Sequence, residues 1–192
     1  MLKIKWEYII TEFVYRKFSK PIARVLARFN VNPTFITFFA TFIGLFSGYV
    51  IAIGRIYEGV AVIFISQIFD CVDGDLARLT NRVTRRGGFL DRVFDRFVDA
   101  AIIIGIVALS PLELWLIGIL AIVGSFGVSM SRAMAEAEGA VCKVGIGGRD
   151  TRLAIIMIGL LLKQFYITLL IIAALGFFTT AHRILHTLKQ LE

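Results

Sequence analysis

Long runs of apolar residues, separated by short charged segments, dominate the pattern of this chain. A helix that crosses a membrane needs about 20 apolar residues. Six segments approach this requirement, and we expect each to be a transmembrane helix: residues 34–54, 57–77, 89–110, 114–134, 151–163 and 164–184. The second and third are apolar over only part of their length, and the boundary between the last two is the least defined. The pattern predicts an all-α, polytopic integral membrane protein with six transmembrane helices.

The first 31 residues follow a different pattern, in which basic and apolar side chains alternate. The basic positions are Arg16, Lys17, Lys20, Arg24 and Arg28, and the apolar ones are Phe18, Ile22, Val25, Leu26 and Phe29. Such a segment is typical of an amphipathic helix in the membrane interface, although a solvated helix packed on the rest of the protein is the alternative. We expect a new helix to begin at Pro21. The chain is thus divided into an interfacial segment, residues 1–31, and a six-helix domain, residues 32–192.

Composition and charge narrow the class of partner. Hydrophobic residues make up 58% of the chain and the mean hydropathy is +0.82, whereas soluble proteins are nearer half apolar. The net charge is +7, but the apolar excess argues against a nucleic-acid partner. The basic residues are better suited to anionic lipid or to a phosphorylated substrate.

The distribution of basic residues predicts the orientation. With six spans, both termini lie on one side of the membrane. All but two of the 21 basic residues fall on that side, and the exceptions are Arg55 and Lys163. Because cytoplasmic loops are rich in Lys and Arg, we expect both termini, the loop within residues 70–95 and the 135–150 loop to face the cytoplasm.

Four aspartates flank the first cytoplasmic loop, in the stretch "DCVDGDLARLTNRVTRRGGFLDRVFD" at residues 70–95. Asp70 and Asp73 are three residues apart, and Asp91 and Asp95 are four apart, so each pair shares a helix face. If the two helices return side by side, the four carboxylates converge. Acidic residues are costly at membrane depth, so we take these four as candidates for a functional site. Other charges here, including Asp75 and Asp99, are interpreted as salt-bridge partners.

The chemistry of this acidic set favours hard cations. Both histidines, His182 and His186, are far away in sequence, and all-oxygen ligands favour Mg²⁺, Mn²⁺ or Ca²⁺ over Zn²⁺. A pair of divalent cations can neutralise a diphosphate during displacement at phosphorus. Small residues at Gly74 and Ala77 allow a phosphate to approach the helix, and Arg78 offers a cation to it.

The spacing Asp70-x2-Asp73-Gly74-x2-Ala77-Arg78-x8-Gly87-x3-Asp91-x3-Asp95 resembles the signature of the CDP-alcohol phosphotransferase family at all eight positions. The resemblance implies transfer of a substituted phosphate from a CDP-alcohol to a second alcohol, with release of CMP. It implies that Asp70, Asp73, Asp91 and Asp95 bind two ions, Mg²⁺ or Mn²⁺, and that Asp95 is also the general base. It further implies that Gly74, Ala77, Arg78, Thr84 and Gly87 bind the CDP group.

Two further stretches resemble the phosphatidylinositol-phosphate synthase branch. In "PIARVLARFNVNPTFIT", residues 21–37, the resemblance implies nucleotide contacts by Thr34 and Thr37. In "SRAMAEAEGAVCKVGIGGRDTRL", residues 131–153, it implies that Arg132, Arg149 and Arg152 bind the phosphate of the acceptor, inositol phosphate. These arginines could instead only anchor the topology.

The acceptor stays open, because Met134 and "GRDTRL" depart from that branch's pattern. Transfer from CDP-inositol to inositol phosphate and synthesis of phosphatidylglycerophosphate are the alternatives, and donor lipids of archaeal type also fit. A homodimer is expected from the resemblance, with small residues in the third and fourth spans permitting close helix contact.

Two other classes, a transporter and a structural membrane protein, fit less well. A transporter is expected to place acids along a path across the membrane. Here the acids gather at one end of two neighbouring segments. Metal-dependent binding of cytidine nucleotide discriminates the enzyme from both.

Overall fold

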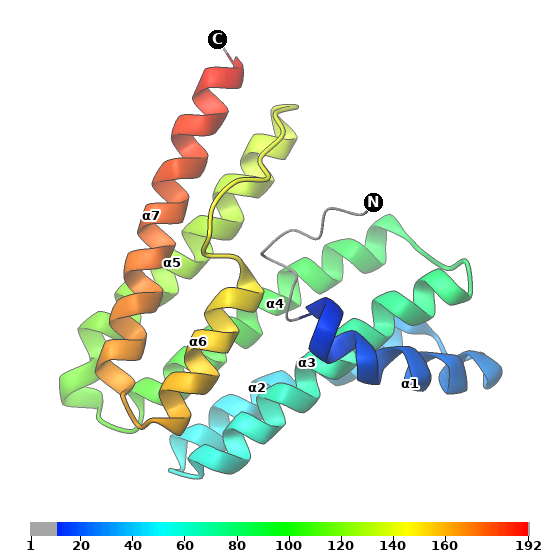
Figure 1. The fold of residues 1–192 in the computed structure, drawn as a ribbon, viewed down its shortest axis with the longest axis horizontal. Helices are drawn as coiled ribbons and strands as arrows, with labels where there is room; N and C mark the ends of the chain where they lie inside the picture. The colour runs from blue at the N-terminus through cyan, green and yellow to red at the C-terminus, as the bar shows by residue number, and fades with distance from the viewer. Residues whose placement is uncertain (1–10, 192) are drawn as a thin grey trace. The chain divides into compact units, whose positions relative to one another are not determined.

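The computed structural model of the chain describes residues 11–191, and over that range it is helical without strands. A short π-helix, η2 (Thr11–Tyr15), leads into seven α-helices (Figure 1): α1 (Arg16–Arg28), α2 (Pro33–Ala52), α3 (Ile56–Leu79), α4 (Arg85–Val107), α5 (Pro111–Ala137), α6 (Arg149–Leu161) and α7 (Phe165–Leu191). Each of the six predicted apolar segments coincides with one of the helices α2 to α7 within four residues at either end, except that α7 continues seven residues beyond the predicted end at 184. The all-α fold class is therefore confirmed.

Three of these helices are long and apolar enough to cross a membrane, namely α2, α5 and α7. The α6 helix has only 13 residues, which is about 20 Å at 1.5 Å per residue, and the hydrocarbon core is about 30 Å thick. The α3 and α4 helices carry the acidic and basic residues of the 70–96 stretch, which lower their hydropathy. The apolar helices indicate a membrane protein.

The described residues form two compact units, which divide between residues 105 and 106. In the first unit, α2 begins at an Asn32 cap, whose side-chain oxygen accepts from the backbone N–H of Thr34 at 3.0 Å. Pro33 occupies the first turn, where its missing N–H costs nothing. Further along, α2 meets α4 so closely that a methyl group added to Gly48 or Gly105 would lie under 3.0 Å from backbone atoms of the other helix.

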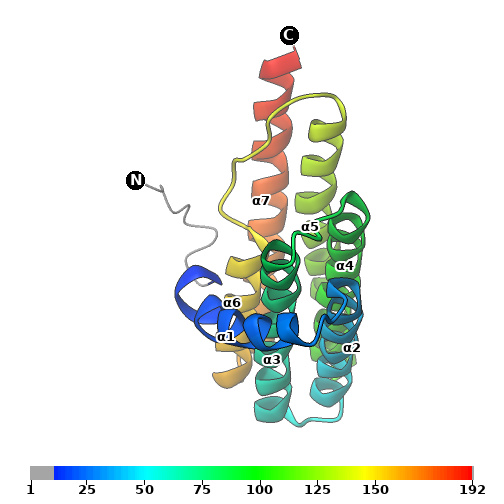
Figure 2. The same ribbon diagram turned by 90° about the vertical axis from the view of Figure 1, so that its right-hand side faces the viewer.

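The α1 helix lies across α3 in the first unit rather than alongside it (Figure 2). Ala23 is fully buried in a cluster with Ile36, Val72 and Leu76. Because Ala23 is small, the backbone of α1 can approach α3 closely, and the buried apolar area stabilises this crossing. The crossing places one face of α1 over the end of α3 that carries the signature residues.

The expected helix start at Pro21 was wrong. Pro21 lies inside α1, which continues directly from η2. A proline within a helix leaves the carbonyl four residues earlier without its usual donor. That carbonyl belongs to Lys17, and both Lys17 and Pro21 are exposed, so solvent can satisfy it.

In the second unit, α5 and α7 pack through Gly124 and Gly176, where an added methyl group would approach the opposite backbone at 3.3 Å or less. The glycines of the third and fourth predicted spans therefore serve packing within the chain, as Gly105 and Gly124 show. The loop between α5 and α6 is held on α7, since the Gly147 N–H donates to Thr179 Oγ1 at 3.0 Å.

Candidate functional site

Three of the four signature aspartates converge as the spacing predicts. Asp70 lies on α3, and Asp91 and Asp95 lie on α4. One carboxylate oxygen from each lies within 4.8 Å of the other two, and all three residues are half-buried. Oxygens at this separation can share one cation, and without a cation their charges repel.

Asp73 lies outside this group of three, but its surroundings also point to a bound cation. The residue is 8% exposed, and its Oδ2 atom is buried with no hydrogen-bond partner. The side chain of Thr37, from α2, contacts the Asp73 carboxyl group. Leaving a buried carboxylate oxygen without a partner is costly, and a bound cation would remove the cost.

The donor set therefore fits a hard divalent cation. All the converging atoms are carboxylate oxygens, which is the ligand type that Mg²⁺ and Mn²⁺ prefer. The half-buried position of Asp70, Asp91 and Asp95 leaves the cluster accessible to a substrate while limiting competition from water. The acidic cluster can hold divalent metal ions.

Arg78 and Gly74, both predicted to bind CDP, lie beside each other on α3. The Arg78 guanidinium forms an ion pair with Asp75 at 2.7 Å. A methyl group added to Gly74 would lie 3.3 Å from the Arg78 Nη2 atom. The absence of a side chain at Gly74 thus leaves room for the Arg78 head group. Ala77, also on α3, has a small side chain and leaves the helix backbone nearby accessible.

Thr84 and Gly87 have a structural role at the start of α4. The Gly87 N–H donates to Thr84 Oγ1 at 3.0 Å, which makes Thr84 the N-cap of the helix. This cap fixes where α4 begins and so sets the register of Asp91 and Asp95. Thr34 at the start of α2 is held in a similar way, through the Asn32 cap.

The three predicted acceptor-binding arginines all lie in the second unit. Arg132 pairs with Glu136 on α5 at 2.8 Å, and Arg149 is the half-buried first residue of α6. Arg152 is only 2% exposed, and its Nη1 atom donates to the Gly147 carbonyl at 2.6 Å. Arg152 therefore ties down the preceding loop, and Arg149 is the more accessible of the two α6 arginines.

Arg183 is a buried cation that the sequence interpretation treated only as a marker of topology. It is 4% exposed and donates to the carbonyls of Val144, at 2.9 Å, and Val128. A charge inside the last apolar segment, 164–184, was the signal that could have found it, because buried charges near a membrane require specific partners.

Comparison with known proteins places this geometry in a family. The model of the CDP-alcohol phosphatidyltransferase family matches residues 30–181, a range that contains the whole signature. The chain is 34% identical over 181 residues to the archaetidylinositol phosphate synthase of Pyrococcus horikoshii, covering 92% of this chain and 95% of that one. It is 36% identical over 194 residues to the corresponding protein of Methanothermobacter thermautotrophicus, covering 97% of each.

Solved structures agree with the sequence relatives. The phosphatidylinositol phosphate synthase of Mycobacterium tuberculosis with CDP-DAG bound has a TM-score of 0.82, with 25% identity over 89% of this chain and 94% of that one. A second structure of that protein, with manganese and citrate, has a TM-score of 0.81, with 26% identity over 88% of each chain. This chain therefore belongs to the CDP-alcohol phosphatidyltransferase family. It is a transferase of phospholipid biosynthesis.

Proposed function

We propose that the protein transfers the phosphatidyl-type group of a CDP-linked diradylglycerol lipid to a hydroxyl of inositol phosphate and releases CMP. The observation that carries this proposal is the convergence of Asp70, Asp91 and Asp95 within 4.8 Å, inside the segment that matches the family. The choice of acceptor is supported by the relatives, which are inositol-phosphate lipid synthases of archaeal and bacterial origin.

Four aspartates hold the metal in this proposal. Asp70, Asp73, Asp91 and Asp95 together bind two divalent cations, Mg²⁺ or Mn²⁺, and the manganese in the mycobacterial relative supports this assignment. When bound, the cations would neutralise the diphosphate of the donor as charge develops on the leaving CMP.

Asp95 acts as the general base. An alcohol is a weak nucleophile at neutral pH, and a positioned carboxylate that accepts its proton accelerates attack. The acceptor oxygen forms a bond to the phosphorus that carries the lipid, the bond from that phosphorus to the CMP oxygen breaks, and the hydroxyl proton passes to Asp95. Its place in the cluster, beside Asp70 and Asp91, supports this role, because a metal ion held there would bring a bound diphosphate close to Asp95.

The other predicted site residues position the substrates. Gly74, Ala77, Arg78, Thr84, Gly87, Thr34 and Thr37 bind the CDP group, and Arg132, Arg149 and Arg152 bind the acceptor phosphate. Thr37 supports the nucleotide assignment because its side chain contacts Asp73 and so lies beside the proposed metal ligands. An arginine cluster suits a phosphorylated acceptor because guanidinium can bind phosphate through two parallel hydrogen bonds.

All six helices α2 to α7 cross the bilayer in this proposal, with both termini and the site on the cytoplasmic side. The α1 helix lies in the interface, where the lipid tails stay in the bilayer while the head groups react. The protein forms a homodimer, a proposal that rests on the resemblance to the family.

The test is an assay of CMP release from the purified protein with CDP-diradylglycerol or CDP-inositol as donor. Each donor is paired in turn with inositol phosphate, glycerol phosphate and serine. We expect the highest kcat/KM for the CDP-lipid with inositol phosphate, and only in the presence of Mg²⁺ or Mn²⁺. If the protein prefers CDP-inositol or glycerol phosphate, the proposed substrates are wrong but the type of reaction stands. Absence of metal-dependent CDP binding would overturn the whole proposal.

A further inference from the structure

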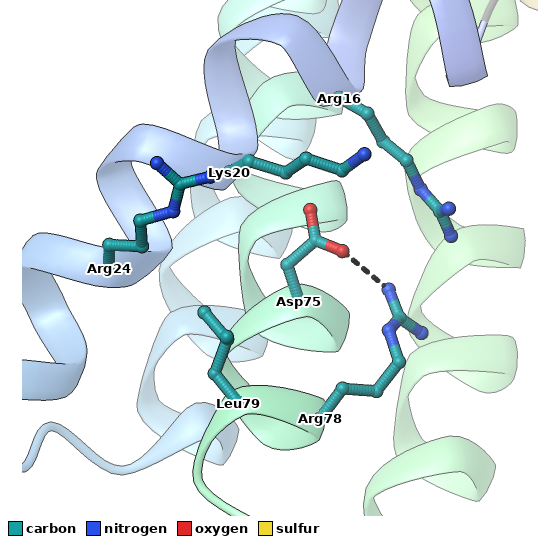
Figure 3. A pocket seen from close by; sticks show the side chains of 6 residues that line it. All are labelled: Arg16, Lys20, Arg24, Asp75, Arg78 and Leu79. Carbon is teal, nitrogen blue, oxygen red and sulfur yellow. Dashed lines mark hydrogen bonds and ion pairs between the residues drawn. The ribbon is translucent and has the colours of Figure 1, made fainter.

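A basic pocket lies between α1 and α3, and of the residues that line it only Arg78 has a role in the chemistry proposed above (Figure 3). Its volume is about 280 Å³. Since one water occupies about 30 Å³ in the liquid, the pocket can accommodate a phosphate group together with several waters. The lining residues are Arg16, Lys20 and Arg24 from α1, and Asp75, Arg78 and Leu79 from α3.

The spacing on α1 concentrates positive charge on one side of the pocket. Arg16, Lys20 and Arg24 recur every four residues and so share one helix face. The fourth cation, Arg78, reaches Asp75 from α3, and Figure 3 shows Lys20 extending over the same carboxylate from α1. Among the described residues that line the pocket, four are cations and one is an acid, which is a formal charge of +3.

Asp75 organises the pocket but does not neutralise it. Its side chain is 8% exposed. One carboxylate oxygen accepts from the Ser19 hydroxyl at 2.5 Å and the other accepts from Arg78 at 2.7 Å. The bond from Ser19 ties α1 to α3, the bond from Arg78 lies within α3, and the lining of the pocket keeps its excess of positive charge.

The pocket faces away from the metal ligands. At 3.6 residues per turn, Asp75 lies about 160° around α3 from Asp73 and about 140° from Asp70. An anion in the pocket is therefore bound on a different face of α3 from the one that carries the acidic cluster. Arg78 lies between these faces, and its ion pair with Asp75 turns its guanidinium toward the pocket.

The surroundings of the pocket suit a lipid. On α1 and just beyond it, Phe18, Val25 and Phe29 are 47%, 52% and 75% exposed. Exposed apolar side chains next to a row of basic ones are typical of a helix that binds anionic membrane surfaces. Because the charge is +3, a phosphate monoester, which carries up to two negative charges, is favoured over a phosphodiester with one.

We propose that the α1–α3 pocket binds a terminal phosphate monoester, that of an anionic membrane lipid. The cations of α1 hold the phosphate oxygens through charge-assisted hydrogen bonds, and the apolar residues of α1 keep the lipid chains at the surface. This site goes beyond the proposed function. Arg78 is the one lining residue that is also assigned to the CDP group, and the variants below leave it unchanged.

The test measures ligand binding to the full-length protein in a neutral detergent. The probes are dihexanoyl phosphatidic acid, dihexanoyl phosphatidylglycerol and inorganic phosphate, each titrated by thermal shift and by isothermal calorimetry. The pocket variant is Lys20→Gln with Arg24→Gln. The matched control is Lys17→Gln with Arg28→Gln, which removes the same charge from exposed positions of α1 that do not line the pocket.

We expect phosphatidic acid to bind at least about tenfold more tightly than phosphatidylglycerol, because of its second charge. The pocket variant should bind phosphatidic acid at least about tenfold more weakly than the unmodified protein does. The control variant should bind it with an affinity within about twofold of that protein's. If inorganic phosphate binds as tightly as phosphatidic acid, the pocket is a phosphate site but its ligand is not a lipid. Unchanged binding by the pocket variant, or an equal loss in the control, would overturn the site. Elution as a single species and retained metal-dependent CDP binding show that the variants are folded.

Discussion

At the scale of single residues, the carboxylates of α3 and α4 are distinguished by their surroundings rather than by their type. Asp70, Asp91 and Asp95 share a half-buried cluster. Asp75, only two residues from Asp73, is instead held by Ser19 and Arg78 on another face of α3. The interpretation of Asp75 as a salt-bridge partner is confirmed by this ion pair.

Asp95→Asn should reduce the rate of CMP release by about 10²–10⁴-fold, because the amide cannot accept the acceptor's proton. The asparagine keeps the size of the side chain, so CDP binding should change by no more than a few-fold. Single-turnover CMP release and a CDP titration measure the two effects. Near-normal turnover in this variant would show that the base lies elsewhere.

Arg149→Ala should raise the KM for inositol phosphate by about tenfold and leave the KM for the CDP-lipid nearly unchanged, since it removes a cation from the proposed acceptor site. Initial rates measured while each substrate is varied separate the two constants. Arg55→Ala is the control, because Arg55 is an exposed arginine of the α2–α3 turn that pairs with Glu58. Equal increases in both constants would remove Arg149 from the acceptor site.

At the scale of elements, close helix packing explains several of the glycines in the apolar segments. The contact between α2 and α4 leaves no space for a methyl group at Gly48, where the nearest atoms belong to the backbone of Ala101. This packing holds the helix that bears Asp91 and Asp95 against α2, while Thr84 sets where that helix begins. The position of the acidic cluster thus depends on the contacts between α2 and α4 further along these helices.

Gly48→Ala should lower the stability of the protein by about 1–3 kcal/mol or more, because a backbone carbonyl cannot move aside as a side chain can. Thermal unfolding in detergent measures the change. Gly88→Ala is the matched control on α4, where the nearest atom to an added methyl group is the end of the Arg92 side chain at 3.7 Å. There we expect unchanged or slightly higher stability, since alanine favours helix more than glycine does. Equal stability of the two variants would contradict the packing argument.

At the scale of the whole molecule, the asymmetry of charge predicts one orientation. Nineteen of the 21 basic residues fall on the side assigned to the cytoplasm, and only Arg55 and Lys163 fall on the other. This bias is typical of membrane proteins inserted with their basic loops inside. The same bias predicts that the acidic cluster faces the cytoplasm.

Single cysteines introduced into a variant with Cys71→Ala and Cys142→Ala test the orientation. Arg55→Cys, in the turn between α2 and α3, should react with a membrane-impermeant maleimide in intact cells. Val83→Cys, a 70% exposed position between α3 and α4, should react only after the cells are opened. Labelling in the reverse order would invert the topology, and labelling of both positions in intact cells would contradict the crossing of α3.

The sequence by itself determined the all-helical class, the positions of the six apolar helices and the acidic signature, because hydrophobic runs and helical spacing are local properties. It misplaced a helix start at Pro21, since the solvent exposure of Lys17 and Pro21 depends on how α1 lies on α3. Only the tertiary structure decided which three carboxylates converge, that Arg152 and Arg183 are buried against loop carbonyls, and that Ser19 meets Asp75 across 56 residues. These contacts depend on the packing of distant segments, which no periodic pattern along the chain encodes.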